Sequence, residues 1–324
     1  MKLLMLCSAL LIVMGCSRNE GPVSSSDQGA LFGIYFLKDS SITEYQANQV
    51  AIDQLGLKDA PWLREEGIEF YDFSSHCIYL KGQKADYFEH HSKFYMFEAG
   101  SRSRPFVVVA NHQRCYVGAF HSGLLSSAPS GPYMDEMDVG YYPVDVMHIS
   151  KAWTSEVDVR KDSRIQDALN ILGLYHGGIS VHLDAVTIIE NSDTSTVEYG
   201  FRVTNEDRVR LVVIDPDKMG TELFHYYTNG VVLHGNGVIV QSTYKKVTSP
   251  TVTCDPRWLT ELQPNESISR TVTLRGYSKI APGIYTCSFT FADPVEVEKG
   301  NRYVSGGRVW LGKVESNGVE VTAQ

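Results

Sequence analysis

The sequence of 324 residues lacks the marks of several common classes of protein. After residue 16 it has no apolar stretch long enough to supply the roughly 20 residues of a membrane-spanning helix. Basic residues are not in excess, because 29 Lys and Arg stand against 38 Asp and Glu, and the formal net charge is −9. Binding to nucleic acid depends on basic side chains that neutralise phosphates, so this composition argues against a nucleic-acid partner.

Sequence motifs of catalysis and cofactor binding are also absent. There is no phosphate-binding glycine loop, no Gly-x-Ser-x-Gly elbow and no His-Glu-x-x-His pair. No closely spaced pair of cysteines is present, which argues against a zinc site of four cysteines. His90 and His91 stand beside Glu89, but adjacent histidines on a helix point about 100° apart and rarely share one ion. We therefore expect no cofactor and no metal site.

The first sixteen residues have the parts of a secretory signal. Lys2 supplies a charged start, Leu3–Met14 form a short apolar core, and Gly15 is the small residue before the cut. The alternative is a transmembrane anchor, but the apolar run is much shorter than the roughly 20 residues that such an anchor needs. Residues 1–15 are therefore predicted to be a signal peptide that is removed on export.

The end of this leader, Val13-Met14-Gly15-Cys16, resembles the lipobox of bacterial lipoproteins. The resemblance implies cleavage after Gly15, a diacylglyceryl group on the Cys16 thiol and further acylation of the new amine. Several acyl chains hold a protein firmly at a membrane, where one chain binds only reversibly. Ser17 after the cysteine suggests the outer membrane. The resemblance thus implies a lipid-anchored protein on the periplasmic or surface face of the cell envelope.

Residues 16–29 are rich in Ser, Gly and polar side chains, which predicts a flexible tether. The whole chain has 43% apolar and 21% charged residues, as globular proteins do, and its length allows two domains. Strand-like runs and helical periodicity alternate in residues 30–155, which predicts an α+β domain. One helix expected there spans Thr43–Leu55, with Gly56 as its stop signal.

A second helix is expected within residues 156–178, as a linker that begins at Asp162 and stops at Gly173. Residues 179–316 contain strand and turn signals alone, and Leu223–Tyr227 is one of the expected strands. Apolar and polar residues alternate from Val197 to Val203, which is the period of a half-buried strand. Seven or more short strands imply a sandwich of antiparallel sheets. The sequence thus predicts an α+β domain followed by an all-β domain, with residues 317–324 as a C-terminal tail.

A tyrosine in the second domain carries a further resemblance. Tyr285 stands two residues before Cys287, as in the tyrosine corner of immunoglobulin-like domains. On this ground residues 179–314 resemble an immunoglobulin-like sandwich. Cys254 lies too close to Cys287 for the usual bridge between sheets, so the resemblance implies the broad architecture without the antibody-type core. The stretch Val197–Gly230 is also loosely similar to intracellular proteinase-inhibitor sandwiches.

Four cysteines remain once the leader is removed and Cys16 is lipidated, namely Cys77, Cys115, Cys254 and Cys287. They fall two on each side of the expected domain boundary. An oxidising envelope favours one bridge in each domain, Cys77–Cys115 and Cys254–Cys287. The alternative is four buried free thiols, because domains of this size do not need disulfides.

The densest group of chemically active side chains lies early in the first domain and consists of Asp72, Ser74, His76 and Cys77. A hydrolase could use the serine or the thiol as a nucleophile and a histidine as its base. Adjacent residues of a strand point to opposite faces, so His76 and Cys77 cannot easily pair. The base would then come from elsewhere, such as His112 or His121. The alternative, which we favour, is a polar turn that enters a strand, with Cys77 bridged or buried.

These features together predict a non-catalytic, membrane-anchored envelope lipoprotein that binds or scaffolds a protein or polysaccharide. Aromatic clusters such as Phe94–Phe97 and His225–Tyr227 would supply contact area with polar tips. Two alternatives remain, a hydrolase-like enzyme centred on the N-terminal domain and a protease inhibitor that acts through the sandwich.

Overall fold

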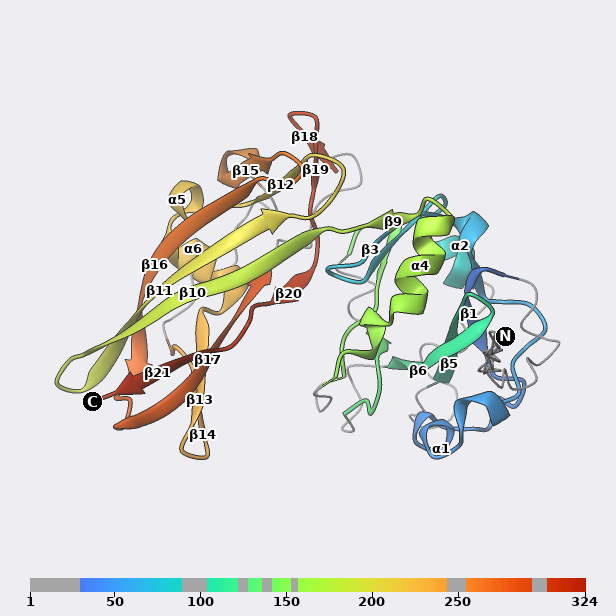
Figure 1. Cartoon of the computed structure of the whole chain (residues 1–324), viewed down its shortest axis with the longest axis horizontal. Coiled ribbons are helices and arrows are strands. Elements are labelled where there is room, and N and C mark those ends of the chain that lie inside the picture. Colours follow the sequence, from blue (N-terminus) through green and yellow to red (C-terminus); the bar gives the residue numbers. More distant parts are fainter. Residues whose placement is uncertain are drawn as a thin grey trace, which may run out of the picture.

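Figure 1 shows the computed structural model of the chain, which describes residues 30–88, 104–121, 128–135, 142–152, 157–243, 255–292 and 302–324. Strands predominate and form several sheets. The sheets gather into two groups, residues 30–176 and residues 179–324, which we call the N-terminal lobe and the C-terminal lobe (Figure 1). The predicted leader, lipidation site and tether, the His90-His91 pair and Cys254 lie outside the described residues.

Two sheets enclose the main core of the N-terminal lobe. One has the strand order β2-β1-β5-β6-β7, formed by β1 Phe32–Phe36, β2 Leu63–Arg64, β5 Arg104–Ala110, β6 Gln113–His121 and β7 Tyr133–Asp135. The other has the order β8-β4-β3-β9, formed by β3 Ile68–Asp72, β4 Cys77–Leu80, β8 Val146–His148 and β9 Tyr175–His176. The helices are α1 Glu44–Asn48, α2 Lys84–Phe88 and α4 Ser163–Ile171, with single turns η1 Ile52–Gln54, η2 Glu65–Gly67 and η4 Val159–Lys161. Every residue of β1 is buried, which explains its continuous apolar run.

Helix α4 is a packed part of this lobe, because Ile165, Ala168 and Leu169 on one of its faces are buried in the core between the two sheets. Asp162 caps the helix by accepting a hydrogen bond from the Arg164 backbone N–H at 2.9 Å. Within the predicted linker, helix α4 is therefore a packed element of the N-terminal lobe.

The two predicted helix stops had different outcomes. Gly173 follows α4 with a φ of 71°, in the left-handed region that was expected. Gly56 does not take this conformation, and the helix expected across Thr43–Leu55 is instead the short α1 and the separate turn η1. The chain is already extended at this point, since Leu57 forms a β-bridge with Leu37 in a small core of its own.

Long antiparallel strands build the C-terminal lobe. The first sheet has the order β10-β11-β16, formed by β10 Ile179–Glu190, β11 Thr194–Asn205 and β16 Ser267–Ser278. The second has the order β14-β13-β17-β20 with β21 also paired to β17, formed by β13 Val231–Gly235, β14 Val238–Val240, β17 Gly283–Ala292, β20 Lys313–Glu315 and β21 Val319–Ala323. A smaller sheet, β15-β12-β19-β18, is formed by β12 Leu211–Ile214, β15 Leu259–Leu262, β18 Tyr303–Val304 and β19 Gly307–Val309. The helical segments are α5 Pro216–Met219, α6 Thr221–Thr228 and the turn η5 Pro256–Trp258.

Local sequence signals were reliable in the long strands of this lobe. Burial alternates along β11 from Val197 to Val203, as the sequence predicted. The hydroxyl of Tyr285 donates a hydrogen bond of 2.9 Å to the Ala281 carbonyl four residues upstream. A tyrosine corner includes a hydrogen bond of this kind, from the hydroxyl back to the backbone a few residues upstream.

Two predictions for the C-terminal lobe were wrong. Leu223–Tyr227 lies in helix α6, because Phe224 and Thr228, which are four residues apart, turn the same helical face toward the core. Residues 317–324 are not a tail, since they include β21, which pairs antiparallel with β17. Val319 and Val321 of β21 pack against the main core of the lobe.

Candidate functional site

The turn from Asp72 to Cys77 joins β3 to β4 and lies where the two lobes meet. Oδ1 of Asp72 accepts hydrogen bonds from the Ser74 N–H at 3.2 Å, the Ser74 hydroxyl at 2.7 Å and the Ser75 N–H at 3.3 Å. Aspartate often bonds in this way to the backbone just ahead of it, so Asp-Phe-Ser-Ser forms the turn locally. His76 has a φ of 55°, a left-handed conformation that few residues other than glycine adopt.

The other carboxylate oxygen of Asp72 forms an ion pair with the C-terminal lobe. Arg308 Nη2 lies 3.0 Å from Asp72 Oδ2 and 2.8 Å from Asp207 Oδ2, and all three side chains are almost fully buried. The guanidinium carbon also lies 4.7 Å from the ring centre of Phe70. Asp207 in turn lies 2.9 Å from Nδ1 of His176 on β9. One arginine thus joins a strand end of the N-terminal lobe to the loop after β11.

The pKa values of Arg308 and Asp207 show that these opposite charges stabilise each other. Burial alone would lower the pKa of Arg308, but the negative charges of Asp72 and Asp207 raise it above its ordinary value. Burial alone would raise the pKa of Asp207, but the hydrogen bond with His176 and the charge of Arg308 lower it. Both partners therefore remain charged at neutral pH, although they are buried.

Ser74 and Cys77 also face the C-terminal lobe. The Ser74 hydroxyl accepts a hydrogen bond from Trp310 Nε1 at 3.0 Å and another from the Ile179 N–H at 3.1 Å. The Cys77 Sγ lies 3.7 Å from the Leu311 carbonyl. A side chain at Gly312 would have its Cβ 2.4 Å from the Cβ of Ser75, so this backbone approach requires glycine. The segment 302–312 therefore fits closely against the turn.

Arg302 makes a second charged connection within the same segment. Its guanidinium forms ion pairs with Glu69 on β3, at 3.2 Å, and with Asp145, just before β8. The guanidinium carbon also lies 5.1 Å from the ring centre of Tyr79. The contact between the lobes therefore contains two arginines of the C-terminal lobe, each paired with at least one acidic residue of the N-terminal lobe.

His76 points away from this contact and into the N-terminal lobe. Its Nδ1 lies 3.1 Å from the Tyr71 hydroxyl, and its Nε2 lies 3.9 Å from Asp158 Oδ2. Burial holds the pKa of His76 well below its usual value, and the charge of Arg160 lowers it further. Asp158 is held by that same arginine, which lowers its pKa to about 2 although burial acts to raise it. The imidazole is therefore neutral and lies on the opposite side of the turn from Ser74 and Cys77.

The four candidate catalytic residues are thus close in space but divided between two environments. Asp72, Ser74 and Cys77 face the C-terminal lobe, whereas His76 faces Tyr71 and Asp158. Neither of the more distant histidines joins them. His112 lies in the turn between β5 and β6, and His121 ends β6, where its ring contacts Tyr133.

Cys77, Cys115 and Cys287 form no disulfide in the structure. The predicted Cys77–Cys115 bridge is not formed, because Cys77 on β4 faces the C-terminal lobe, whereas Cys115 on β6 packs against the core of the N-terminal lobe. Burial raises the pKa of both Cys115 and Cys287 to about 11, so neither is an activated nucleophile. Cys287 forms no disulfide in the structure, so its predicted bridge to Cys254, which lies outside the described residues, is not formed either.

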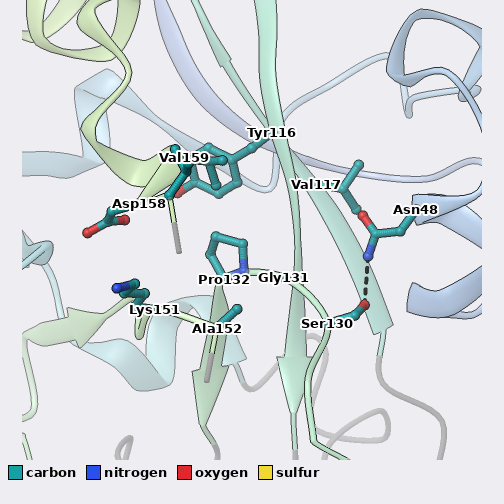
Figure 2. Close-up of a pocket in the computed structure, with 11 residues that line it drawn as sticks. Asn48, Tyr116, Val117, Ser130, Gly131, Pro132, Lys151, Ala152, Asp158 and Val159 are labelled. Atoms are coloured by element: carbon teal, nitrogen blue, oxygen red, sulfur yellow. Dashed lines mark hydrogen bonds between the residues drawn. The ribbon is translucent and has the colours of Figure 1, made fainter. Parts of the chain in front are cut away.

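A small cavity lies in the N-terminal lobe beside Asp158 (Figure 2). It has a volume of about 180 Å³, and Tyr116, Pro132 and Lys151 are among its walls. Its rim is fixed by Glu44, whose Oε1 accepts hydrogen bonds from the Ser130 N–H, the Ser130 hydroxyl and the Gly131 N–H at 2.7–2.9 Å. The walls therefore mix one carboxylate and one amine with apolar side chains.

A larger cavity of about 330 Å³ lies next to the first, with which it shares Lys151 and Ala152. Arg160 lines it from the N-terminal lobe, and Lys313 and Glu315 of β20 line it from the C-terminal lobe. This cavity is therefore bounded by both lobes.

Within the described ranges, no group of three or more His, Cys, Asp or Glu side chains is placed to hold a metal ion. Among the helices of those same ranges, none has the length and apolar character to cross a membrane.

Sequence reasoning missed the partners of the Asp72 turn. Arg308 and Trp310 lie more than 230 positions further along the chain, Asp207 belongs to the loop after β11, and His176 ends the two-residue strand β9. An arginine in a strand and an isolated histidine belong to no recognisable sequence motif, so only the fold could reveal these partners.

The chain matches no known protein-family model and no curated protein.

Proposed function

We propose that this chain is a non-catalytic lipoprotein of the bacterial cell envelope that binds or scaffolds a protein or polysaccharide. The observation that supports this most is the burial of Asp72 in an ion pair with Arg308 at 3.0 Å. The polar turn that a hydrolase would use is occupied in joining the two lobes. The lipobox-like leader that ends at Cys16 would hold this assembly at a membrane.

A catalytic serine or cysteine must reach both a base and the substrate. The Ser74 hydroxyl instead exchanges hydrogen bonds with Asp72, Trp310 and Ile179, and the Cys77 side chain is fully buried. The neighbouring base His76 faces the other way and is itself fully buried. This arrangement favours a structural role for the turn over a hydrolytic one.

We further propose that the two lobes are separate domains and that the C-terminal one is an immunoglobulin-like sandwich. The Tyr285 hydrogen bond to Ala281 and the facing antiparallel sheets support this. Such sandwiches carry many unrelated functions, so the architecture alone assigns none.

Exposed apolar side chains support a contact function for the C-terminal lobe. Val238 and Ile239 on the edge strand β14 are 51% and 65% exposed, and Ile284 on β17 of the same sheet is 65% exposed. An edge strand has backbone groups that can pair with another chain, and exposed apolar residues commonly mark interaction sites.

The proposal is tested by photocrosslinking in intact cells that express the full lipoprotein. We expect a photoreactive residue at Ile239 to capture a defined envelope component, whereas one at exposed Ile171, on α4 of the other lobe, should not. A Cys16→Ala precursor should remain uncut and unlipidated. Recovery of no partner, together with robust turnover of a substrate that depends on Ser74 or Cys77, would contradict the proposal.

A further inference from the structure

The cavity of about 330 Å³ between the lobes has an unusual charge for this protein. Three cationic side chains line it, Lys151, Arg160 and Lys313; Glu315 also lines it, and Asp158 pairs with Arg160 from outside the lining, so one positive charge is in excess. The whole chain has a formal net charge of −9. A concave site with this excess of positive charge, within an acidic protein, would concentrate anions.

Arg160 is held in place for such a role. Its Nε and Nη2 donate to the two oxygens of Asp158 at 2.8 Å each, and its Nη1 donates to the Ile149 carbonyl at 2.5 Å. A guanidinium has five N–H donors, so two remain after these three bonds. The side chain is 11% exposed and cannot swing freely. Arg160 thus offers a fixed, planar donor at the cavity wall.

The two lysines complete the positive wall from opposite lobes. Lys151 Nζ lies 3.6 Å from Glu315 Oε2, in a long ion pair between partly exposed side chains, which contributes little and is easily exchanged for another anion. Lys313 forms no ion pair with any carboxylate of the described residues. The hydroxyls of Ser150 and Thr290 also line the cavity. Hydroxyls can bond to sugar or oxyanion oxygens alike.

We propose that this cavity binds a small ligand that carries an oxyanion, either a carboxylate, a sulfate or a phosphate, on a body about the size of one sugar unit. Its volume is at the lower end of the roughly 300–1,000 Å³ of typical ligand sites, which admits one such unit. Arg160 and the two lysines would hold the anionic group, and the hydroxyls would orient the rest. The ligand would come from an acidic saccharide of the envelope. This source rests on the proposed binding function at the envelope.

Calorimetric titration of the full lipoprotein in detergent tests this site. The probes are inorganic phosphate, sulfate and glucuronate, with glucose as the neutral control. We expect at least one anion to bind, with an affinity that falls as salt increases, and glucose to bind at least about tenfold more weakly. Preference for glucuronate would indicate a uronic acid, and preference for phosphate or sulfate would indicate a modified sugar.

Lys313→Gln and Lys151→Gln should each weaken anion binding by about tenfold, because each removes one charge-assisted hydrogen bond. Lys279→Gln removes the same charge from an exposed position outside the cavity lining and should leave binding unchanged. In the unmutated protein, bound anion should slow acylation of Lys313 while that of Lys279 is unaffected, as measured by mass spectrometry.

The inference is overturned if no anion binds, if Lys151→Gln and Lys313→Gln bind the anion as tightly as Lys279→Gln does, or if bound anion leaves the acylation of Lys313 in the unmutated protein unchanged. Crosslinking at Ile239 would be unchanged by that result. Failure of this site can therefore be distinguished from failure of the proposed envelope function.

Discussion

The buried guanidinium of Arg308 offers the strongest test of how the two lobes are joined. In Arg308→Met the side chain keeps much of its apolar volume but loses its charge. Asp72 and Asp207, whose side chains are 0% exposed, would then face each other without their shared cation. Removing one partner of a buried ion pair typically costs about 3–5 kcal/mol, mainly because the remaining charge is stranded.

Several contacts of Arg308 determine how much unfolding free energy its loss should cost. Arg308 Nη2 makes two charge-assisted hydrogen bonds, of 3.0 and 2.8 Å, and its guanidinium also packs on Phe70. Asp207 keeps His176 as a partner and Asp72 keeps the N–H groups of its turn, which limits the loss. We therefore expect Arg308→Met to lower the free energy of unfolding by about 3–5 kcal/mol. Domains are typically stable by only about 5–15 kcal/mol, so the effect is large.

Urea unfolding followed by tryptophan fluorescence measures this loss, and buried Trp310 reports on the contact itself. Asp72→Asn added to Arg308→Met should recover part of the loss, because it removes one of the stranded charges. The matched control is Arg257→Met, which breaks an ion pair whose arginine side chain is 88% exposed and should leave the urea midpoint unchanged. The reasoning is refuted if both arginine variants unfold at the wild-type midpoint.

Three further predictions concern the interior of the molecule. Since burial depresses the pKa of His76, unfolding free energy should be constant above pH 6.5 and fall by up to about 1.4 kcal/mol per unit below it. Asparagine tolerates the left-handed backbone at this position, so His76→Asn should abolish the fall in unfolding free energy. Urea titrations between pH 5 and 7 measure this, because carboxylates of low pKa stay ionised in that range. Mass spectrometry of unreduced protein should find Cys77 and Cys287 alkylated only after denaturation and partly buried Cys115 alkylated slowly; a Cys77–Cys115 peptide would contradict the structure. Glu44→Gln, which weakens three hydrogen bonds at the small cavity, should lower stability by about 1–3 kcal/mol in the same urea assay, and an unchanged midpoint would contradict this.

The features that the sequence predicted correctly depend on near neighbours in the chain. Alternation along Val197–Val203 is enough to bury one face of β11, and Gly173 meets a backbone requirement that arises within one helical turn. The hydrogen bond from the Tyr285 hydroxyl to the Ala281 carbonyl likewise spans only four residues. Predictions failed where distant packing decided between local options. Leu223–Tyr227 has enough aromatic residues for a strand, but Phe224 packs in the core as part of a helix.

The candidate site shows the same limit of prediction from local sequence. The sequence located the Asp72–Cys77 turn and the opposite directions of His76 and Cys77, although His76 belongs to the turn, with a left-handed backbone, and only Cys77 belongs to the strand. It could not supply Arg308, which pairs with Asp72 across 236 positions. Spacing along the chain contains no information on such a partner when neither residue belongs to a repeated motif.

Chemical composition alone does not distinguish an active site from a buried polar contact, because both gather acids, hydroxyls and imidazoles. The distinction lies in how the hydrogen-bonding capacity is used. A buried polar group must be paired, whereas a catalytic group must keep capacity for its substrate. Asp72 uses one carboxylate oxygen for its own turn and the other for Arg308, and Ser74 bonds to both lobes. The lysines of the cavity beside β20 retain capacity of this kind, and it is there, rather than at the turn, that a ligand should be sought.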